Sequence, residues 1–69
     1  MLIKLIENES KNECIINTDC ITTMRAEGPQ TTTTVFLNDG RWIDVTSSIA
    51  DIVTIIEKGG NIYDTEGEA

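Results

Sequence analysis

Residues 31–58 constrain the fold of this chain more than any other segment. The threonine-rich run at 31–37 is β-branched, the Asn-Asp-Gly at 38–40 is a tight-turn signal, and residues 42–46 alternate as a second strand. The next segment has serines at its start, isoleucines at helical spacing and paired glycines at its end, which predicts a helix at about 47–58. A β-hairpin that leads into one helix is therefore expected in the second half.

The first half of the chain has the pattern of three further short strands. Residues 2–17 read as a hairpin around a polar turn, and Thr18 and Asp19 form a corner. The strand at 20–26 follows, and a break is expected at 27–30, where Gly and Pro interrupt the pattern.

These elements predict a mainly β protein. The expected architecture is a five-stranded, twisted antiparallel sheet or small open barrel with one C-terminal α-helix packed on it. Residues 1–60 are expected to form a single β-rich domain, and residues 61–69 an acidic flexible tail. The four consecutive threonines suit an exposed or edge strand. Strict alternation along 20–26 places Met24 on the face opposite Ile21.

The expected helix has one apolar stripe. Ile49, Ile52, Val53 and Ile56 recur at i, i+3, i+4 and i+7, so they are predicted to face the core. Ile55 lies outside this stripe, which suggests that a second surface is also covered, for example by another subunit.

The chain is acidic. Twelve acidic residues stand against five basic ones in 69 residues, which gives a formal charge of −7. This balance disfavours direct nucleic-acid binding, because such proteins replace phosphate counterions with cations. It leaves open a basic partner protein, a local cationic pocket, or an acid excess that only keeps a small domain soluble.

The cysteine content and the small size of the chain limit the ways in which its fold can be stabilised. Cys14 and Cys20 are expected to be reduced apolar residues, with a disulfide across the short turn as the alternative. The sequence contains no histidine, so two thiols cannot complete a zinc site, and neither a metal nor a cofactor is expected. A 69-residue core is marginal without a staple, so homo-oligomerisation is the default expectation.

No targeting or membrane segment is expected. The N-terminal sequence becomes polar within six residues, and nothing approaches the roughly 20 apolar residues of a membrane span. The predicted localisation is cytoplasmic.

The order of these signals resembles the small flagellar FlbD-like family, which includes short phage and mobile-element proteins. The resemblance spans residues 2–58 and implies a small β-rich fold, a regulatory or assembly role and no catalytic residues. The matching segments are Ile3-Lys4-Leu5, Ile16-Asn17-Thr18-Asp19-Cys20-Ile21, Thr33-Thr34-Val35-Phe36-Leu37-Asn38-Asp39-Gly40, and Val45-Thr46-Ser47-Ser48 leading into Ile49–Ile56.

No catalytic constellation is visible, so the chain is not expected to be an enzyme. Neither Ser47, Ser48 nor the cysteines have a histidine to activate them. Asp39 is a turn former and Asp44 a solvent-facing strand residue, which argues against a paired acid and base.

Arg25, Arg41 and Trp42 are the candidate ligand-binding residues. Arginine forks bind carboxylate or phosphate in a bidentate manner, and tryptophan offers a stacking face. The alternative is structural: Trp42 fills the core or a subunit interface, and Arg41 is a solvated turn residue.

Three functions are compatible with these observations. The first is an oligomeric, non-catalytic binding module, as in a phage or mobile-element accessory protein, which sequesters an anionic nucleotide-like ligand or blocks a host protein. The second is a flagellar FlbD-like accessory protein. The third is an acidic mimic of nucleic acid.

Overall fold

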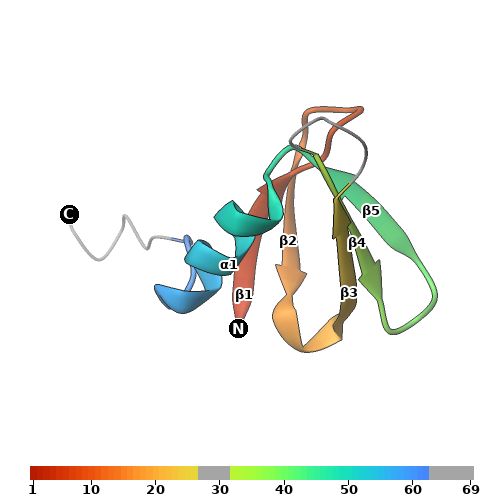
Figure 1. Ribbon diagram of the computed structural model, residues 1–69. Helices are drawn as coiled ribbons and strands as arrows, with labels where there is room; N and C mark the ends of the chain where they lie inside the picture. The colour runs from red at the N-terminus through yellow and green to blue at the C-terminus, as the bar shows by residue number, and fades with distance from the viewer. Residues whose placement is uncertain (27–31, 63–69) are drawn as a thin grey trace.

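The computed structural model describes residues 1–26 and 32–62, which form two antiparallel sheets and one helix (Figure 1). The predicted mainly β fold with one C-terminal helix is confirmed. The predicted break at 27–30 and residues 63–69 of the predicted tail lie outside the described residues. The elements are β1 (Leu2–Ile6), β2 (Glu13–Asn17), a 3₁₀ turn (Thr18–Cys20), β3 (Ile21–Ala26), β4 (Thr33–Leu37), β5 (Trp42–Val45) and α1 (Ile49–Glu57).

The strands do not form the single five-stranded sheet or barrel that the sequence predicts. One sheet has the order β1-β2 and the other β3-β4-β5. An isolated antiparallel bridge between Glu7 and Val45 links the two, and the Thr46 N–H donates to the Ile6 carbonyl at 3.0 Å beside it.

A side chain binds the open edge of β1 beyond this link. The Asn61 side chain accepts a hydrogen bond from the Lys4 N–H at 2.8 Å and donates to the Lys4 carbonyl at 2.7 Å. The outward backbone groups of Lys4 are therefore satisfied by Asn61. In the register of the Glu7–Val45 bridge, Lys4 would lie opposite Ser48, the N-cap of α1, and not opposite a residue of β5. Asn61, which the sequence assigns to a loose tail, is anchored to β1.

Both hairpins form at the predicted turns. β1 and β2 pair with Ile3 opposite Ile16, and Lys11 in their connection has a positive φ of 62°. β4 and β5 are joined by the predicted Asn-Asp-Gly turn, in which Gly40 has a φ of 89°. The Asn-Asp-Gly signal accounts for the second turn, whereas in the first turn a lysine adopts the left-handed conformation.

The last two threonines of the run, Thr33 and Thr34, lie in a central strand, so the expectation of an exposed or edge strand is wrong for them. β4 lies between β3 and β5, and Thr33 and Thr34 are buried. Their hydroxyls are satisfied because Thr33 Oγ1 donates to the Ser47 carbonyl at 2.7 Å and Thr34 Oγ1 to Asp44 Oδ1 at 2.6 Å. Threonine is tolerated inside because each hydroxyl has a partner.

A β-bulge overturns the alternation predicted for β3. The register shifts between Ile21 and Thr23, so Ile21 and Met24 both pack against the core. Thr22 and Thr23 are both exposed. An extra residue in one strand changes which side chains face inward.

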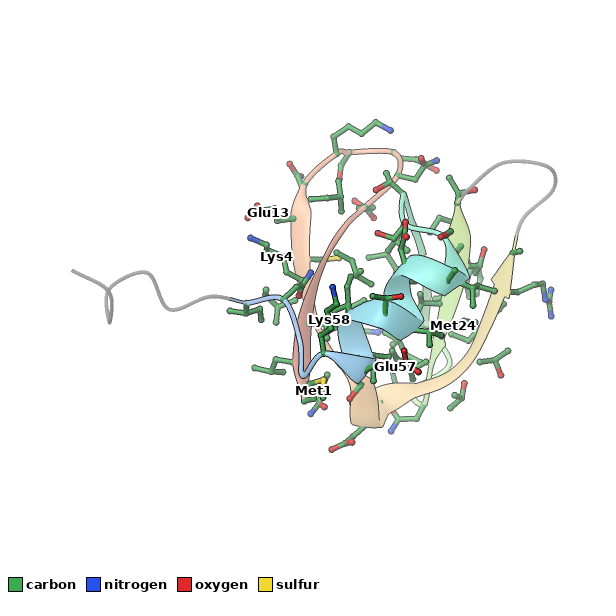
Figure 2. All side chains as sticks on the ribbon, turned by 60° about the vertical axis from the view of Figure 1, so that its left-hand side comes forward. Met1, Lys4, Glu13, Met24, Glu57 and Lys58 are labelled. Atoms are coloured by element: carbon green, nitrogen blue, oxygen red, sulfur yellow. The ribbon has the colours of Figure 1, made fainter. Side chains whose placement is uncertain are left out.

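The core lies between the two sheets and the helix. Figure 2 shows α1 between the two-stranded sheet and the three-stranded sheet. The buried hydrophobic residues come from both sheets and the helix: Ile3, Leu5, Ile16, Val35, Val45 and Ile52.

The apolar face of α1 is rotated from the predicted stripe. Ile52 is fully buried, and Ile55 and Ile56 pack against the core. Val53, predicted to be internal, is 39% exposed. Ile55 therefore needs no second subunit to cover it.

The ends of α1 follow the predicted signals. Ser48 is the N-cap, and its Oγ accepts from the Asp51 N–H at 3.1 Å. Gly59 has a φ of 89°, and its N–H donates to the Ile56 carbonyl at 3.0 Å. No helix in the described part of the chain has the length and apolar character needed to cross a membrane.

Candidate functional site

Trp42 is the most exposed large hydrophobic side chain of the described residues, at 64%. It begins β5 and lies opposite Phe36 of β4. Val35 and Val45 face the core, so strand alternation places Trp42 and Phe36 on the outer face of the three-stranded sheet. The alternative that Trp42 fills the core of the single chain is therefore wrong.

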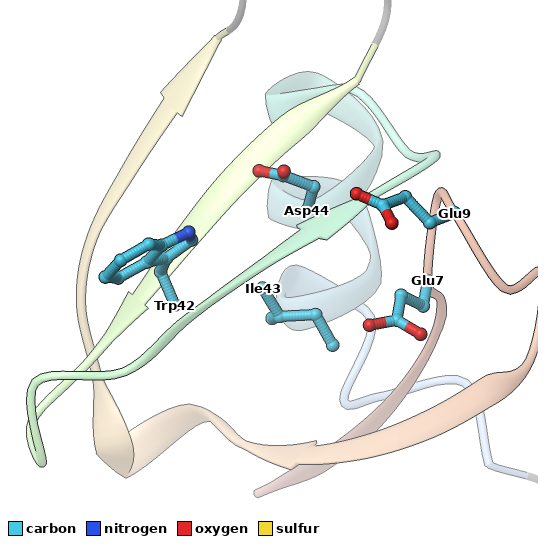
Figure 3. Close-up of a pocket in the computed structure, with 5 residues that line it drawn as sticks. All are labelled: Glu7, Glu9, Trp42, Ile43 and Asp44. Carbon is cyan, nitrogen blue, oxygen red and sulfur yellow. The ribbon is translucent and has the colours of Figure 1, made fainter.

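A shallow pocket beside Trp42 is dominated by carboxylates. Glu7, Glu9 and Asp44 line it together with Trp42 and Ile43, and its volume is about 170 Å³ (Figure 3). Trp42 and Asp44 project from one face of β5, whereas Ile43 projects from the other. The polypeptide that follows β1 brings the two glutamates toward β5.

Three contacts hold Asp44 and Glu7 in place. Asp44 accepts a hydrogen bond from the buried Thr34 hydroxyl, as described above. Glu7 is held by its backbone bridge to Val45, and its carboxylate accepts from the Ser10 hydroxyl. The pocket therefore lies where the bridge connects the two sheets. Neighbouring groups position at least two of its three carboxylates, those of Asp44 and Glu7.

Arg41 forms a hydrogen bond and an ion pair with Asp39 in the hairpin turn. Its Nε lies 2.7 Å from Asp39 Oδ2, and its backbone N–H donates to Asp39 Oδ1 at 3.0 Å. The backbone bond, followed by the side-chain bond, lowers the pKa of the Asp39 carboxyl below its usual range. The Arg41 side chain nevertheless remains 79% exposed.

Arg25 lies on the outer face of β3 against an aromatic ring. Its guanidinium carbon is 5.2 Å from the centroid of the Phe36 ring, a cation–π distance. Both residues line a hollow of about 260 Å³ that also includes Thr22, Thr23 and Gly40.

The structure does not bring the three predicted site residues into one pocket. Arg41 and Trp42 line a groove of about 250 Å³ between β2 and β5, and Arg25 lines the separate hollow beside Phe36. Arg25 and Trp42 share the outer face of the sheet, with Phe36 on the strand between them. In the described chain, each of these three hollows is smaller than the roughly 300 Å³ at which small-molecule sites begin.

The two cysteines are free thiols. Cys14 lines the groove between β2 and β5, and its Sγ donates to the Leu5 carbonyl at 3.4 Å. Burial, together with the nearby charge of Glu7, raises the pKa of the Cys14 thiol. Within 1–26 and 32–62, no group of three or more potential ligands is arranged to hold a metal ion.

Sequence reasoning missed the acidic side of the site. Glu7 and Glu9 belong to a segment that reads only as the start of a turn, and Asp44 reads as a solvated strand residue. Their proximity depends on the bridge between the sheets, which no local pattern indicates. Asp39 is different, since the turn signal Asn-Asp-Gly already predicts a side chain that binds the backbone two residues later.

No family model, curated protein or solved structure matches this chain.

Proposed function

We propose that this chain is a small non-catalytic binding module that captures a basic segment of another protein at the outer face of β5. The observation that carries the proposal is an indole that is 64% exposed on the wall of a pocket lined by three carboxylates. A lysine or arginine side chain can enter such a pocket while its stem lies on the indole.

The charge of the whole chain supports a basic partner. A formal charge of −7 attracts cationic surfaces over a distance of about 8–10 Å at physiological salt. Exposed tryptophan is common at the centre of protein interfaces, where it supplies much of the binding energy. The combination of a stacking residue and surrounding acids supports recognition of a segment that alternates apolar and basic residues.

The size of the hollows supports a protein partner over a free nucleotide. A pocket of about 170 Å³ accommodates one side chain, whereas nucleotide-sized ligands fill larger clefts. The predicted anionic ligand at Arg25, Arg41 and Trp42 would need arginines from neighbouring subunits to converge. Titration with nucleotides tests that prediction.

The acidic mimic of nucleic acid is compatible with this proposal, whereas the flagellar role is independent of it. An acidic mimic of nucleic acid is a special case of it, because the partner surface would again be basic. The flagellar role implied by the FlbD-like resemblance stays a prediction, and the proposal does not depend on it.

Calorimetric titration with a peptide that alternates lysine and leucine tests the proposal. Binding should weaken by about tenfold in the variant Glu7→Gln/Glu9→Gln/Asp44→Asn, since three surface ion pairs contribute about 0.5 kcal/mol each. A control variant, Asp19→Asn/Asp51→Asn/Glu57→Gln, removes the same number of charges at exposed positions elsewhere. An equal loss in both variants would show that only net charge matters and would contradict a specific site.

A further inference from the structure

The four outer strand edges of the two sheets are protected to different extents. β1 is covered at Lys4 by the Asn61 side chain, and the Ile6 carbonyl is bonded to Thr46. β5 is covered at its end, where the Asp44 carbonyl accepts from the Asn8 N–H at 2.8 Å. Cover of this kind prevents strand addition.

The remaining two edges belong to β3 and β2. β3 carries the bulge between Ile21 and Thr23 and the charged side chain of Arg25, both of which are common protections of an edge. β2 has no bulge, and within the described residues no strand pairs with its second side, although the groove between β2 and β5 lies along it. Its central side chain, Ile15, is 52% exposed.

The direction of the β2 backbone follows from its pairing with β1. Lys4 lies opposite Ile15, and the Lys4 N–H and carbonyl point away from β2, toward Asn61. Lys4 and Ile15 are therefore a non-hydrogen-bonded pair, so the Ile15 N–H and carbonyl point away from β1. By alternation, the backbone groups of Glu13 and Asn17 point to the same open edge.

We infer that β2 is a homodimerisation edge, on which β2 of a second copy adds antiparallel about a two-fold axis at Ile15. In this register Ile15 pairs with Ile15 of the second copy, and Glu13 lies opposite its Asn17. All three outward-facing residues of each strand then exchange backbone hydrogen bonds. The product is a continuous four-stranded sheet of order β1-β2-β2-β1.

Charge and polarity select this register over the others. Centring the pair on Glu13 places two carboxylates opposite each other, and centring it on Ile16 places Glu13 opposite Asp19, which is also repulsive. Centring it on Cys14 places Ile15 opposite Glu13, and centring it on Asn17 leaves few residues paired. Only the register at Ile15 buries the exposed isoleucine against itself without opposing like charges.

The side chains at the edge suit this arrangement. Asn17 Oδ1 accepts from the Asp19 N–H at 3.0 Å, which leaves the Asn17 amide NH₂ group to donate across the interface. The Glu13 side chain lies on the hairpin surface, 3.7 Å from Lys4 Nζ (Figure 2). It is 65% exposed and can accept from Asn17 of the second copy while it keeps Lys4 beside it. A four-stranded sheet also extends a core that is small for an independent domain.

Sedimentation equilibrium of the whole chain is the first test. Wild type should have twice the 7.6 kDa mass of one chain, and Ile15→Glu should have the single mass, because it opposes two carboxylates at the axis. Ile62→Glu is the matched control, since Ile62 is 47% exposed outside the sheets. A monomeric wild type, or a dimeric Ile15→Glu, would overturn the inference.

Disulfide trapping tests the register without relying on that variant. In a Cys14→Ser/Cys20→Ser background, Ile15→Cys should crosslink two chains on oxidation, because residues in a hydrogen-bonded antiparallel pair have Cα atoms about 5.5 Å apart. Glu13→Cys should not crosslink, because its partner is Asn17. Equal crosslinking of both variants, or of neither, would contradict the proposed axis.

Polar substitutions provide a third readout. Asn17→Asp keeps an acceptor for the Asp19 N–H but opposes Glu13 of the second copy, so the dimer should weaken by about fivefold or more. Adding Glu13→Gln should restore the affinity. Failure of the second substitution to rescue the first would rule out this pairing, whatever the outcome for binding of a basic peptide.

Discussion

The side chain of Asn61 forms two hydrogen bonds with the backbone of Lys4, at 2.8 and 2.7 Å, across 57 positions of sequence. The amide group acts as a short substitute for a neighbouring strand, because it offers one acceptor and one donor to the open edge of β1. This contact fixes the polypeptide that follows α1.

Asn61→Ala should lower the free energy of unfolding by about 1–3 kcal/mol, because two partly buried backbone groups lose their partners. Urea denaturation gives the change, and hydrogen exchange should show faster exchange of the Lys4 amide. Ile62→Ala is the control at the next position. Asn61→Asp should not restore full stability, since a carboxylate cannot donate to the Lys4 carbonyl; full stability in that variant would refute the two-bond account.

Ile52→Ala should cost about 2–5 kcal/mol, since the side chain is fully buried between the helix and both sheets. Val53→Ala, one residue further, should change stability by no more than about 0.5 kcal/mol, because Val53 is partly exposed. Thermal and chemical denaturation of the two variants compare adjacent positions on one helix. Equal losses would show that α1 packs by another face.

The Asp39 carboxyl should titrate below its usual range in wild type, as measured by NMR. Because the folded pKa is lowered, this group stabilises the fold above its unfolded pKa, and that stabilisation is lost as the pH falls through the folded pKa. Arg41→Ala should raise the Asp39 pKa only part of the way, since the larger cause is the backbone N–H at position 41. No change in that variant would mean that the Arg41–Asp39 ion pair does not form in solution.

Cys14 should be alkylated more slowly than an unfolded thiol at neutral pH, because burial raises its pKa and only the thiolate reacts. In a Cys20→Ser background, the alkylation rate of Cys14 should rise with pH, and the midpoint of this rise should lie at a higher pH than in the denatured chain. Glu7→Gln should move this midpoint down, since the Glu7 charge is the second cause. Because the folded pKa is raised, the associated stability is complete below the unfolded pKa of the thiol and declines above it. A midpoint equal to that of the denatured chain would contradict the burial of Cys14.

The elements of this fold can be predicted from sequence where their signals are local. Gly40 permits the β4–β5 turn, Ser48 caps α1, and Gly59 ends it, so each boundary has its cause within a few residues. The same applies to the contact between Asp39 and Arg41, which depends on a single turn.

The features that the sequence does not predict depend on contacts between distant segments. The bulge in β3 moves Ile21 and Met24 to one face, and the central position of β4 buries Thr33 and Thr34. The contact between Asn61 and Lys4 joins segments 57 positions apart in the sequence. The candidate site has the same origin, because the carboxylates beside Trp42 come from both sides of the bridge between the sheets.

The most direct test of partner recognition is a fluorescence titration, because Trp42 is the single tryptophan of the chain. The lysine–leucine peptide should shift Trp42 emission in a saturable, salt-sensitive manner, whereas its glutamate–leucine counterpart and linear or cyclic nucleotides should not. The response should weaken in the Glu7→Gln/Glu9→Gln/Asp44→Asn variant. A saturable shift with a nucleotide that is lost in Arg41→Ala, with none from the basic peptide, would contradict the proposal and favour an anionic ligand.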